Sequence, residues 1–205
     1  MHYHWYNLQA LLTPAECKRV IKHAQRHYPA AEAVVGHGAA ARKDQMRSTT
    51  IRWLDYADLD LLWLRLRIEK YILIANREGF GFNLQPGFTE IQFTEYHGES
   101  RDHYDWHEDN ASTMKKPMDR KLSFVLQLSD PKDHTGGQFE LTPNADPLPP
   151  TAYKQQGDAL LLRSGLKHRA KIGSLILPIA AIRGEGTSND YFPPEVPALP
   201  SFALQ

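Results

Sequence analysis

Residues 14–27 carry the clearest helical pattern in the chain. Thr13 precedes them as a cap, Pro14 occupies the first helical position, and Glu16 stands three residues after the cap. This order is typical of a capping box, in which the cap and the third helical residue each bond the other's backbone N–H. We therefore expect a helix from Pro14 to about His27.

A second, longer helix is predicted from about Tyr56 to Asn76, because apolar residues recur there at helical spacing. Its expected apolar side consists of Leu61, Leu62, Leu64, Ile68, Ile72 and Leu73. Residues 28–46 are rich in Ala, Gly and charged side chains, which predicts a loop.

The remaining patterned segments favour β-structure. Strands are predicted at residues 47–54, 88–96, 120–129, 138–141 and 158–163, separated by polar or Pro- and Gly-rich turns. Within 88–96, alternation places Ile91 and Phe93 on one face and Thr94 and Tyr96 on the other. Several short strands with polar turns are typical of a jelly roll or barrel. The expected class is α+β, mainly β, with the N-terminal helices packed on one sheet.

A chain of 205 residues fits a single domain. We expect residues 1–85 to form a helical support region and residues 86–185 the β-rich core. Residues 186–205 contain four prolines, which indicates an irregular tail.

Composition restricts the classes of function. Twenty-four Lys and Arg residues balance 24 Asp and Glu, so the chain has no bulk attraction for nucleic acid or anionic lipid. Cys17 is the only cysteine, which excludes an internal disulfide and a thiolate metal cluster. The start lacks a secretory signal, and the longest apolar run, 175–182, is too short for a membrane span. We expect a soluble, cytoplasmic protein.

The candidate chemistry begins with the pair His107 and Asp109. Residues two apart on an extended chain point to the same side, so both can reach one metal ion. A second imidazole must then come from elsewhere, and His168, which closely follows the strand 158–163, is the best candidate. Two His and one carboxylate form the facial triad of non-haem iron(II) oxygenases, although zinc remains compatible.

Alternatives remain open at this point. The segment His103-Tyr-Asp105 has the same spacing as the candidate pair, and His134 is another possible distal ligand. One His-x-Asp pair is expected by chance in a chain with this many His and Asp residues, so the pair alone is not specific.

The surrounding motifs resemble the prolyl-4-hydroxylase-like branch of the 2-oxoglutarate/iron(II) dioxygenases. The segment Ile91–Tyr96 leads through Gly98 to Tyr104, which stands three residues before His107, as in that family. No tyrosine stands three before His103, so the resemblance selects His107 and Asp109. Further family-like elements follow in the same order: Arg120–Ser129, Gly136–Glu140 and Gln156–Leu160, with Arg47–Leu54 and Ala75–Phe82 upstream.

The resemblance implies a double-stranded β-helix that binds Fe(II) through His107, Asp109 and His168. It also implies 2-oxoglutarate as cosubstrate, with ascorbate as a further candidate. The expected reaction hydroxylates an aliphatic carbon of a protein, peptide or amino acid and converts 2-oxoglutarate to succinate. Tyr96 and Gln127 correspond to cosubstrate-binding positions.

The C-terminal segment departs from the family. There a basic residue nine or ten positions after the distal His pairs with the far carboxylate of 2-oxoglutarate, but here those positions hold Leu177 and Pro178. Arg183 is the first candidate for a replacement. Arg169 and Lys171 are further candidates, and a divergent segment with no replacement is the third alternative.

That last alternative predicts a different function. A jelly-roll binding module that has lost the cosubstrate cation would be non-catalytic or impaired. A nucleic-acid demethylase of the same superfamily is disfavoured by the balanced charge.

Overall fold

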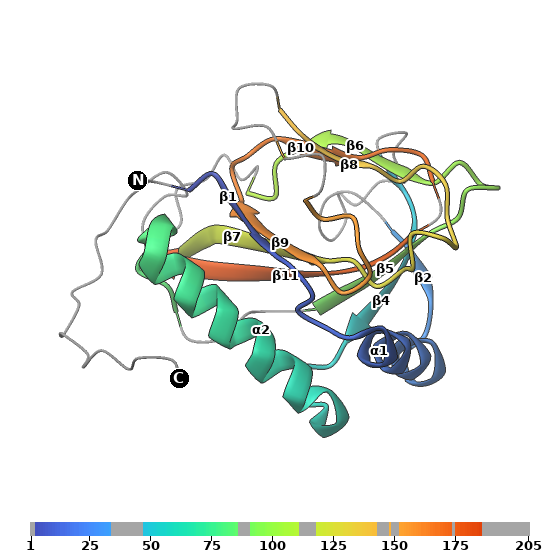
Figure 1. The fold of residues 1–205 in the computed structure, drawn as a ribbon, viewed down its shortest axis with the longest axis horizontal. Coiled ribbons are helices and arrows are strands. Elements are labelled where there is room, and N and C mark those ends of the chain that lie inside the picture. Colours follow the sequence, from blue (N-terminus) through green and yellow to red (C-terminus); the bar gives the residue numbers. More distant parts are fainter. Residues whose placement is uncertain are drawn as a thin grey trace.

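The computed structural model describes residues 3–33, 47–85, 91–110, 118–142, 148, 152–173 and 175–185. Two antiparallel sheets dominate this part of the chain (Figure 1). In spatial order, the larger sheet contains β1 (Trp5–Leu8), β9 (Ala159–Arg163), β7 (Met118–Leu126), β11 (Leu175–Glu185), β5 (Ile91–Tyr96), β4 (Thr50–Leu54) and β2 (Ala31–Glu32). The smaller sheet contains β3 (Arg47–Ser48), β6 (His103–His107), β10 (His168–Ala170) and β8 (Phe139–Leu141).

The first helix, α1 (Pro14–His27), has the predicted bounds and the predicted cap. The Thr13 side chain accepts a hydrogen bond from the Glu16 N–H, and the Glu16 carboxylate accepts one from the Thr13 N–H. α1 buries Cys17, Val20 and Ala24 on one side, so the capping box fixes where an amphipathic helix begins.

The second helix begins later than predicted. A 3₁₀ turn, η2 (Leu59–Leu61), precedes α2 (Leu62–Ala75), and a π-helical turn, η3 (Asn76–Phe80), follows it. The Asp58 carboxylate accepts from the Asp60 N–H and caps the turn, which explains the later start. Among the described residues, no helix is long and apolar enough to cross a bilayer.

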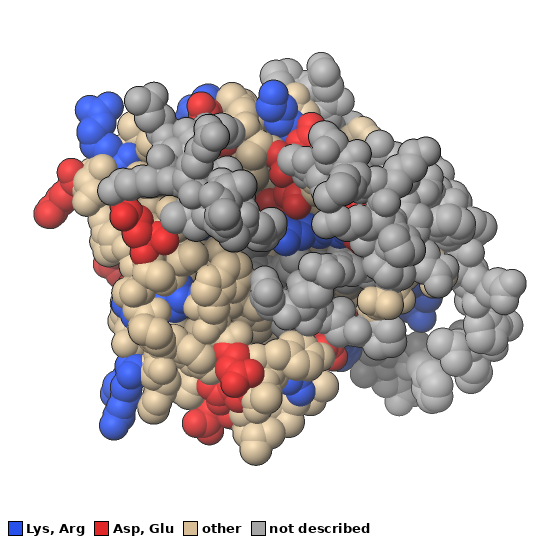
Figure 2. All heavy atoms as spheres, turned by 180° about the vertical axis from the view of Figure 1, so that it is seen from behind, with Lys and Arg blue, Asp and Glu red and all other residues tan. Residues whose placement is uncertain are grey.

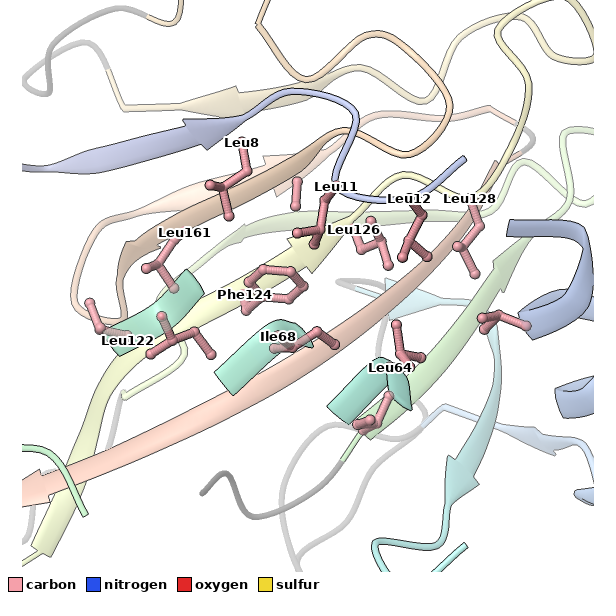
Figure 3. Packing of buried hydrophobic residues seen from close by; sticks show 14 of the residues in the cluster. Leu8, Leu11, Leu12, Leu64, Ile68, Leu122, Phe124, Leu126, Leu128 and Leu161 are labelled. Atoms are coloured by element: carbon pink, nitrogen blue, oxygen red, sulfur yellow. The ribbon is translucent and has the colours of Figure 1, made fainter. Parts of the chain in front are cut away.

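α2 covers the face of the larger sheet that is turned away from the smaller sheet (Figure 1). Leu64 and Ile68 point from the helix towards Phe124 and Leu126 of β7 (Figure 3). Ile72 is buried with them, but Leu73 is 59% exposed, so its predicted place on the apolar side is wrong. The larger buried cluster therefore lies between the two helices and this face of the larger sheet.

A second buried cluster lies on the inner side of the larger sheet. Along β7, Phe124 belongs to the cluster under the helices, whereas Val125 belongs to this inner cluster. Tyr96 and Leu160 contribute from the neighbouring part of the sheet, and Ala170 contributes from the smaller sheet. The predicted faces of β5 are confirmed, because Phe93 and Tyr96 belong to different clusters.

The first 85 residues contribute strands as well as helices. β1 pairs with β9, with Trp5 opposite Leu162, and β4 pairs with β5. Sequence analysis did not indicate β1. The predicted tail, residues 186–205, lies outside the described residues, as does most of the predicted loop 28–46.

β11 occupies the centre of the larger sheet although it contains Pro178. Pro178 lies opposite Phe93 of β5, and the register with β7 begins one residue later, at Ile179. A proline lacks the N–H that a strand donates to its neighbour. This residue therefore lies where only one neighbouring strand is paired. The side chains of β11, including Arg183, lie outside the described part of the structure.

Candidate metal centre

The fold brings the three candidate ligands together from distant segments. His107 ends β6 and lies directly opposite His168, which begins β10. Asp109 follows β6 by two residues, and its N–H donates to the Ser164 carbonyl at 2.9 Å. This bond ties the segment after β6 to the turn that leads into β10.

The ligand atoms of these residues face one another. Asp109 Oδ1 lies 3.6 Å from His107 Nε2, and Asp109 Oδ2 lies 3.8 Å from His168 Nε2. One ligand atom from each of these three residues lies within 4.8 Å of the other two. Metal–nitrogen bonds are about 2.1 Å long, so these separations leave room for one ion between the three atoms.

Backbone carbonyls fix the tautomer of both imidazoles. His107 Nδ1 lies 2.7 Å from the Asp105 carbonyl, and His168 Nδ1 lies 2.8 Å from the Leu166 carbonyl. A carbonyl can only accept, so each Nδ1 carries the hydrogen and each Nε2 presents a lone pair. Both Nε2 atoms are therefore in the form that binds a metal.

The competing ligands lie elsewhere. His103 Nδ1 bonds to the Arg101 carbonyl, and this residue is not part of the cluster around Asp109. His134 Nε2 instead lies 3.2 Å from Gln127 Nε2. A second cluster of possible ligands, formed by His23, Asp58 and Asp60, lies beside the capped turn before α2.

The electrostatics favour a charged Asp109 carboxylate beside a neutral His168. Burial alone would raise the pKa of Asp109, but the proximity of His107, His168 and Arg120 lowers it overall. Arg120 Nη1 lies 3.9 Å from Asp109 Oδ1. Burial lowers the pKa of His168, which favours its neutral form.

Aromatic stacking holds both imidazole rings. Tyr104 stacks on His107 with ring centroids 3.4 Å apart, and Phe139 stacks on His168 at 5.2 Å. The Arg47 guanidinium lies over the Tyr104 ring, 4.6 Å from the ring centroid. The motif pointed to Tyr104, but no sequence signal identified Arg47 or Phe139 as its neighbours.

The two predicted cosubstrate residues face the inner cluster or lie next to it. Tyr96 is buried in it, and burial raises the pKa of its hydroxyl. Gln127 is 4% exposed, and its Oε1 has no hydrogen-bond partner among the described residues. His134 Nδ1 and the Tyr153 hydroxyl are buried in the same unpartnered state, and sequence analysis assigned neither to a cosubstrate.

The three basic residues considered as replacements for the cosubstrate cation lie in different places. The backbone of Arg183 lies opposite Arg120, but its side chain is outside the described structure. Arg169 and Lys171 both pair with Glu140, at 2.7 and 2.5 Å. His168 points into the site, and Arg169 next to it points to the other face of the strand. These two cations are therefore already neutralised away from the candidate ligands.

The described surface carries both signs of charge. Figure 2 shows Asp and Glu interspersed with Lys and Arg on one face of the molecule. This distribution agrees with the balanced composition.

Comparisons with solved structures find the same fold in prolyl hydroxylases. A Pseudomonas putida prolyl-4-hydroxylase is 18% identical, with a TM-score of 0.62 over 87% of this chain and 92% of the other. A viral collagen prolyl hydroxylase from Paramecium bursaria Chlorella virus-1 is 14% identical, with a TM-score of 0.62 over 88% and 96%. A Trichoplax adhaerens prolyl hydroxylase, solved with a hypoxia-inducible-factor peptide fragment, is 17% identical, with a TM-score of 0.64 over 87% and 83%. These matches imply a double-stranded β-helix.

A search of curated proteins found no match. Residues 91–173, however, match the profile of the 2OG-Fe(II) oxygenase superfamily, and this segment contains all three candidate ligands. This segment of the chain is therefore similar to the 2OG-Fe(II) oxygenase superfamily.

Proposed function

We propose that this protein is an Fe(II)- and 2-oxoglutarate-dependent dioxygenase that hydroxylates an aliphatic carbon. The observation that carries the proposal is the convergence of His107 Nε2, His168 Nε2 and the Asp109 carboxylate on one point. Iron bound there would supply the oxidising chemistry, with dioxygen and 2-oxoglutarate consumed and succinate and carbon dioxide released. We place this centre in a double-stranded β-helix with the helices on the larger sheet.

The residues of the chain bind and orient in this scheme. Two neutral nitrogens and one carboxylate oxygen are suited to non-haem iron and leave positions open for a cosubstrate. Cys17, the only thiol, is buried in α1 and belongs to the core under the helices, so it cannot add a ligand. Tyr104 and Phe139 hold the two rings in place.

For the substrate we propose a protein, a peptide or an amino acid. The support is the likeness to prolyl hydroxylases, one of which was solved with a peptide fragment and another of which is described as a collagen prolyl hydroxylase. A prolyl side chain has the kind of unactivated C–H bond that this chemistry hydroxylates.

Succinate formation tests the proposal. Purified protein would be incubated with Fe(II), 2-oxoglutarate, ascorbate and proline-containing peptides, and succinate would be measured against a His107→Ala control. Formation above that control, with a matching gain of one oxygen in the peptide, is expected. Equal succinate in both samples would show that the activity does not depend on the proposed centre.

The second candidate is a non-catalytic binding module. It is favoured by one observation, the apolar residues Leu177 and Pro178 where a cosubstrate cation is expected. Tight metal binding with no affinity for 2-oxoglutarate would support this candidate and exclude the oxygenase.

A further inference from the structure

Arg47 is a buried cation without an acidic partner. It is 8% exposed, and in the described part of the chain no Asp or Glu forms an ion pair with it. Arg52, on the next strand along the chain, instead pairs with Glu95 at 3.1 Å. Removing a charge from water is costly unless a group of opposite charge compensates. The burial of Arg47 is therefore explained if an anionic ligand binds beside it.

Neutral groups hold the guanidinium in place. Its Nε donates to Thr49 Oγ1 at 3.1 Å, and its Nη2 donates to Gln92 Oε1 at 2.7 Å. Its Cζ lies 4.6 Å from the centroid of the Tyr104 ring. Nη1 makes no hydrogen bond with a described residue, and it is not one of the enclosed polar atoms that lack a partner. Nη1 is therefore a fixed donor that a ligand can reach.

Gln92 adds a second donor from the larger sheet. Its Oε1 accepts from Arg47 and also, at 3.4 Å, from Thr94 Oγ1. A guanidinium nitrogen can only donate, so this contact fixes which way the amide is turned. Gln92 Nε2 then carries two hydrogens, has no partner among the described residues and is not enclosed. Arg47 Nη1 and Gln92 Nε2 thus offer hydrogens from the two facing sheets, a set suited to a carboxylate.

The two donors lie close to the candidate metal centre. The Tyr104 ring contacts the Arg47 guanidinium and also stacks on His107, with the two ring centroids 3.4 Å apart. Two direct contacts therefore join Arg47 to a candidate ligand. An anion bound at Arg47 is separated from His107 by a single aromatic ring, so one small substrate can reach both the anion and the metal.

This place differs from the position of the family's cosubstrate cation. That position is Leu177 in β11, which lies opposite Thr94 of β5. Gln92 lies two residues earlier in β5, about 7 Å along the strand. Gln92 is instead opposite Trp53 of β4, whose side chain is 50% exposed. Arg47 therefore contacts a row of the sheet that continues to solvent, which suits a substrate that enters from outside.

Trp53 supplies an apolar surface beside the donors. Residues directly opposite each other on antiparallel strands place their side chains on the same face, so Trp53 and Gln92 are neighbours. An indole beside an amide and a guanidinium can bind a molecule with an apolar part and a charged end.

The other arginines near the centre are less suited to this role. Arg120 is partly exposed and lies 3.9 Å from Asp109 Oδ1, so it is directed at a candidate ligand itself. Arg169 is also partly exposed and pairs with Glu140. Neither combines burial with the absence of an acidic partner.

We propose that Arg47 and Gln92 bind a carboxylate of the substrate, with Trp53 against its apolar part. This assignment rests on the oxygenase function proposed above. It narrows the substrate to molecules with a carboxylate close to the carbon that is hydroxylated. The carboxylate belongs either to the C-terminus of the substrate or to an acidic side chain beside the reacting residue, and the chemistry of the site is the same for both.

Matched acid and amide probes test the assignment. Calorimetry on protein saturated with Mn(II) and 2-oxoglutarate would compare N-acetylproline with its amide, and acetyl-Asp-Pro-amide with acetyl-Asn-Pro-amide. Each pair differs in a single carboxylate. In at least one pair the acid should bind about tenfold more tightly, the effect typical of a hydrogen bond to a charged group. The pair that shows the preference identifies the source of the carboxylate.

Variants show whether Arg47 causes the preference. Arg47→Met should bring the ratio of the two Kd values close to one, whereas Arg47→Lys should keep part of it, since it keeps the charge but not the planar fork. Gln92→Leu should reduce the ratio less than Arg47→Met. Arg19→Met, which changes an arginine over the Trp63 ring, should keep the full ratio. The ratio compares two ligands on one protein at metal saturation, so weaker metal binding does not alter it.

Two results overturn the assignment while the oxygenase function stands. One is that no acid binds more tightly than its amide, or that the preference survives in Arg47→Met. The other is that Arg47→Met weakens 2-oxoglutarate but not 2-oxobutanoate, which lacks the far carboxylate, because Arg47 would then bind the cosubstrate. Wild-type protein that binds Mn(II) but no 2-oxoglutarate overturns the oxygenase function, and the assignment with it.

Discussion

The guanidinium of Arg47 lies over the ring of Tyr104, with 4.6 Å between its Cζ and the ring centroid. Tyr104 in turn stacks on His107 at 3.4 Å. The two residues are opposite each other in the pairing of β3 with β6. Arg47 on the edge strand β3 thus packs on the Tyr104 ring, which packs on the candidate ligand His107. The pairing of β3 with β6 therefore helps to orient the His107 imidazole.

Replacing this cation should weaken metal binding without removing a ligand. Arg47→Met keeps an unbranched apolar stem but loses the bonds to Gln92 and Thr49 and the charge over Tyr104. We expect a fall in Mn(II) affinity of about tenfold, the lower end for residues that orient metal ligands. Titration monitored by electron paramagnetic resonance would measure it.

Arg19→Met provides the comparison, because Arg19 lies over Trp63 at 5.1 Å, outside the candidate centre. This variant should bind Mn(II) like the wild type. An Arg47→Met protein with full metal affinity would show that the stack does not orient His107.

The pair of His107 and Asp109 could be selected from the sequence as candidate ligands because its signal is local. His107 and Asp109 are two residues apart, and Tyr104 three residues before them selected this pair over the one at His103. The capping box of α1 is also local, and its prediction was confirmed. In both cases a few neighbouring residues define the geometry.

The contacts around the centre depend on pairings between distant segments. The position of Arg47 over Tyr104 requires β3 to pair with β6, and Tyr153 reaches the inner cluster from a turn held by Asn7 of β1. No spacing in the sequence indicates either contact. The length of the apolar stripe on α2 misled the prediction for Leu73, because the helix is apolar on most sides and only packing shows which side is buried.

Adjacent residues of α2 should therefore differ strongly in their effect on stability. Ile72 is buried in the core cluster, whereas Leu73 is 59% exposed. Ile72→Ala is expected to lower the free energy of unfolding by about 2–5 kcal/mol. Leu73→Ala should change it by about 0.5 kcal/mol or less. Urea denaturation followed by circular dichroism would compare the two, and equal losses would contradict the observed orientation of α2.

The thiol of Cys17 should be unreactive in the folded protein. It is fully buried in α1, and burial, with a smaller effect of Glu16, raises its pKa to about 12. The thiolate is the reactive form, so labelling with a disulfide reagent at pH 8 should require unfolding. A stoichiometric label at the rate of a free thiol in native buffer would contradict this burial.

The raised pKa of Cys17 also makes the free energy of unfolding depend on pH. The folded-state pKa is raised, so the contribution of the thiol is fully present below its unfolded pKa near 9 and is lost as the pH rises towards 12. Stability should therefore fall over this window. Cys17→Ala has no thiol to ionise and should show a smaller fall, although other groups titrate there in both proteins.

Histidine replacements separate the proposed metal ligand from its competitor. His168→Ala removes one of the nitrogens that face Asp109, so Mn(II) affinity should fall by about 100-fold or more, beyond the effect of an orienting residue. His134→Ala should leave it unchanged, because His134 contacts Gln127 and lies outside the ligand cluster. The reverse result would assign the distal position to His134. His27→Ala, on the exposed side of α1, controls for the loss of an imidazole as such.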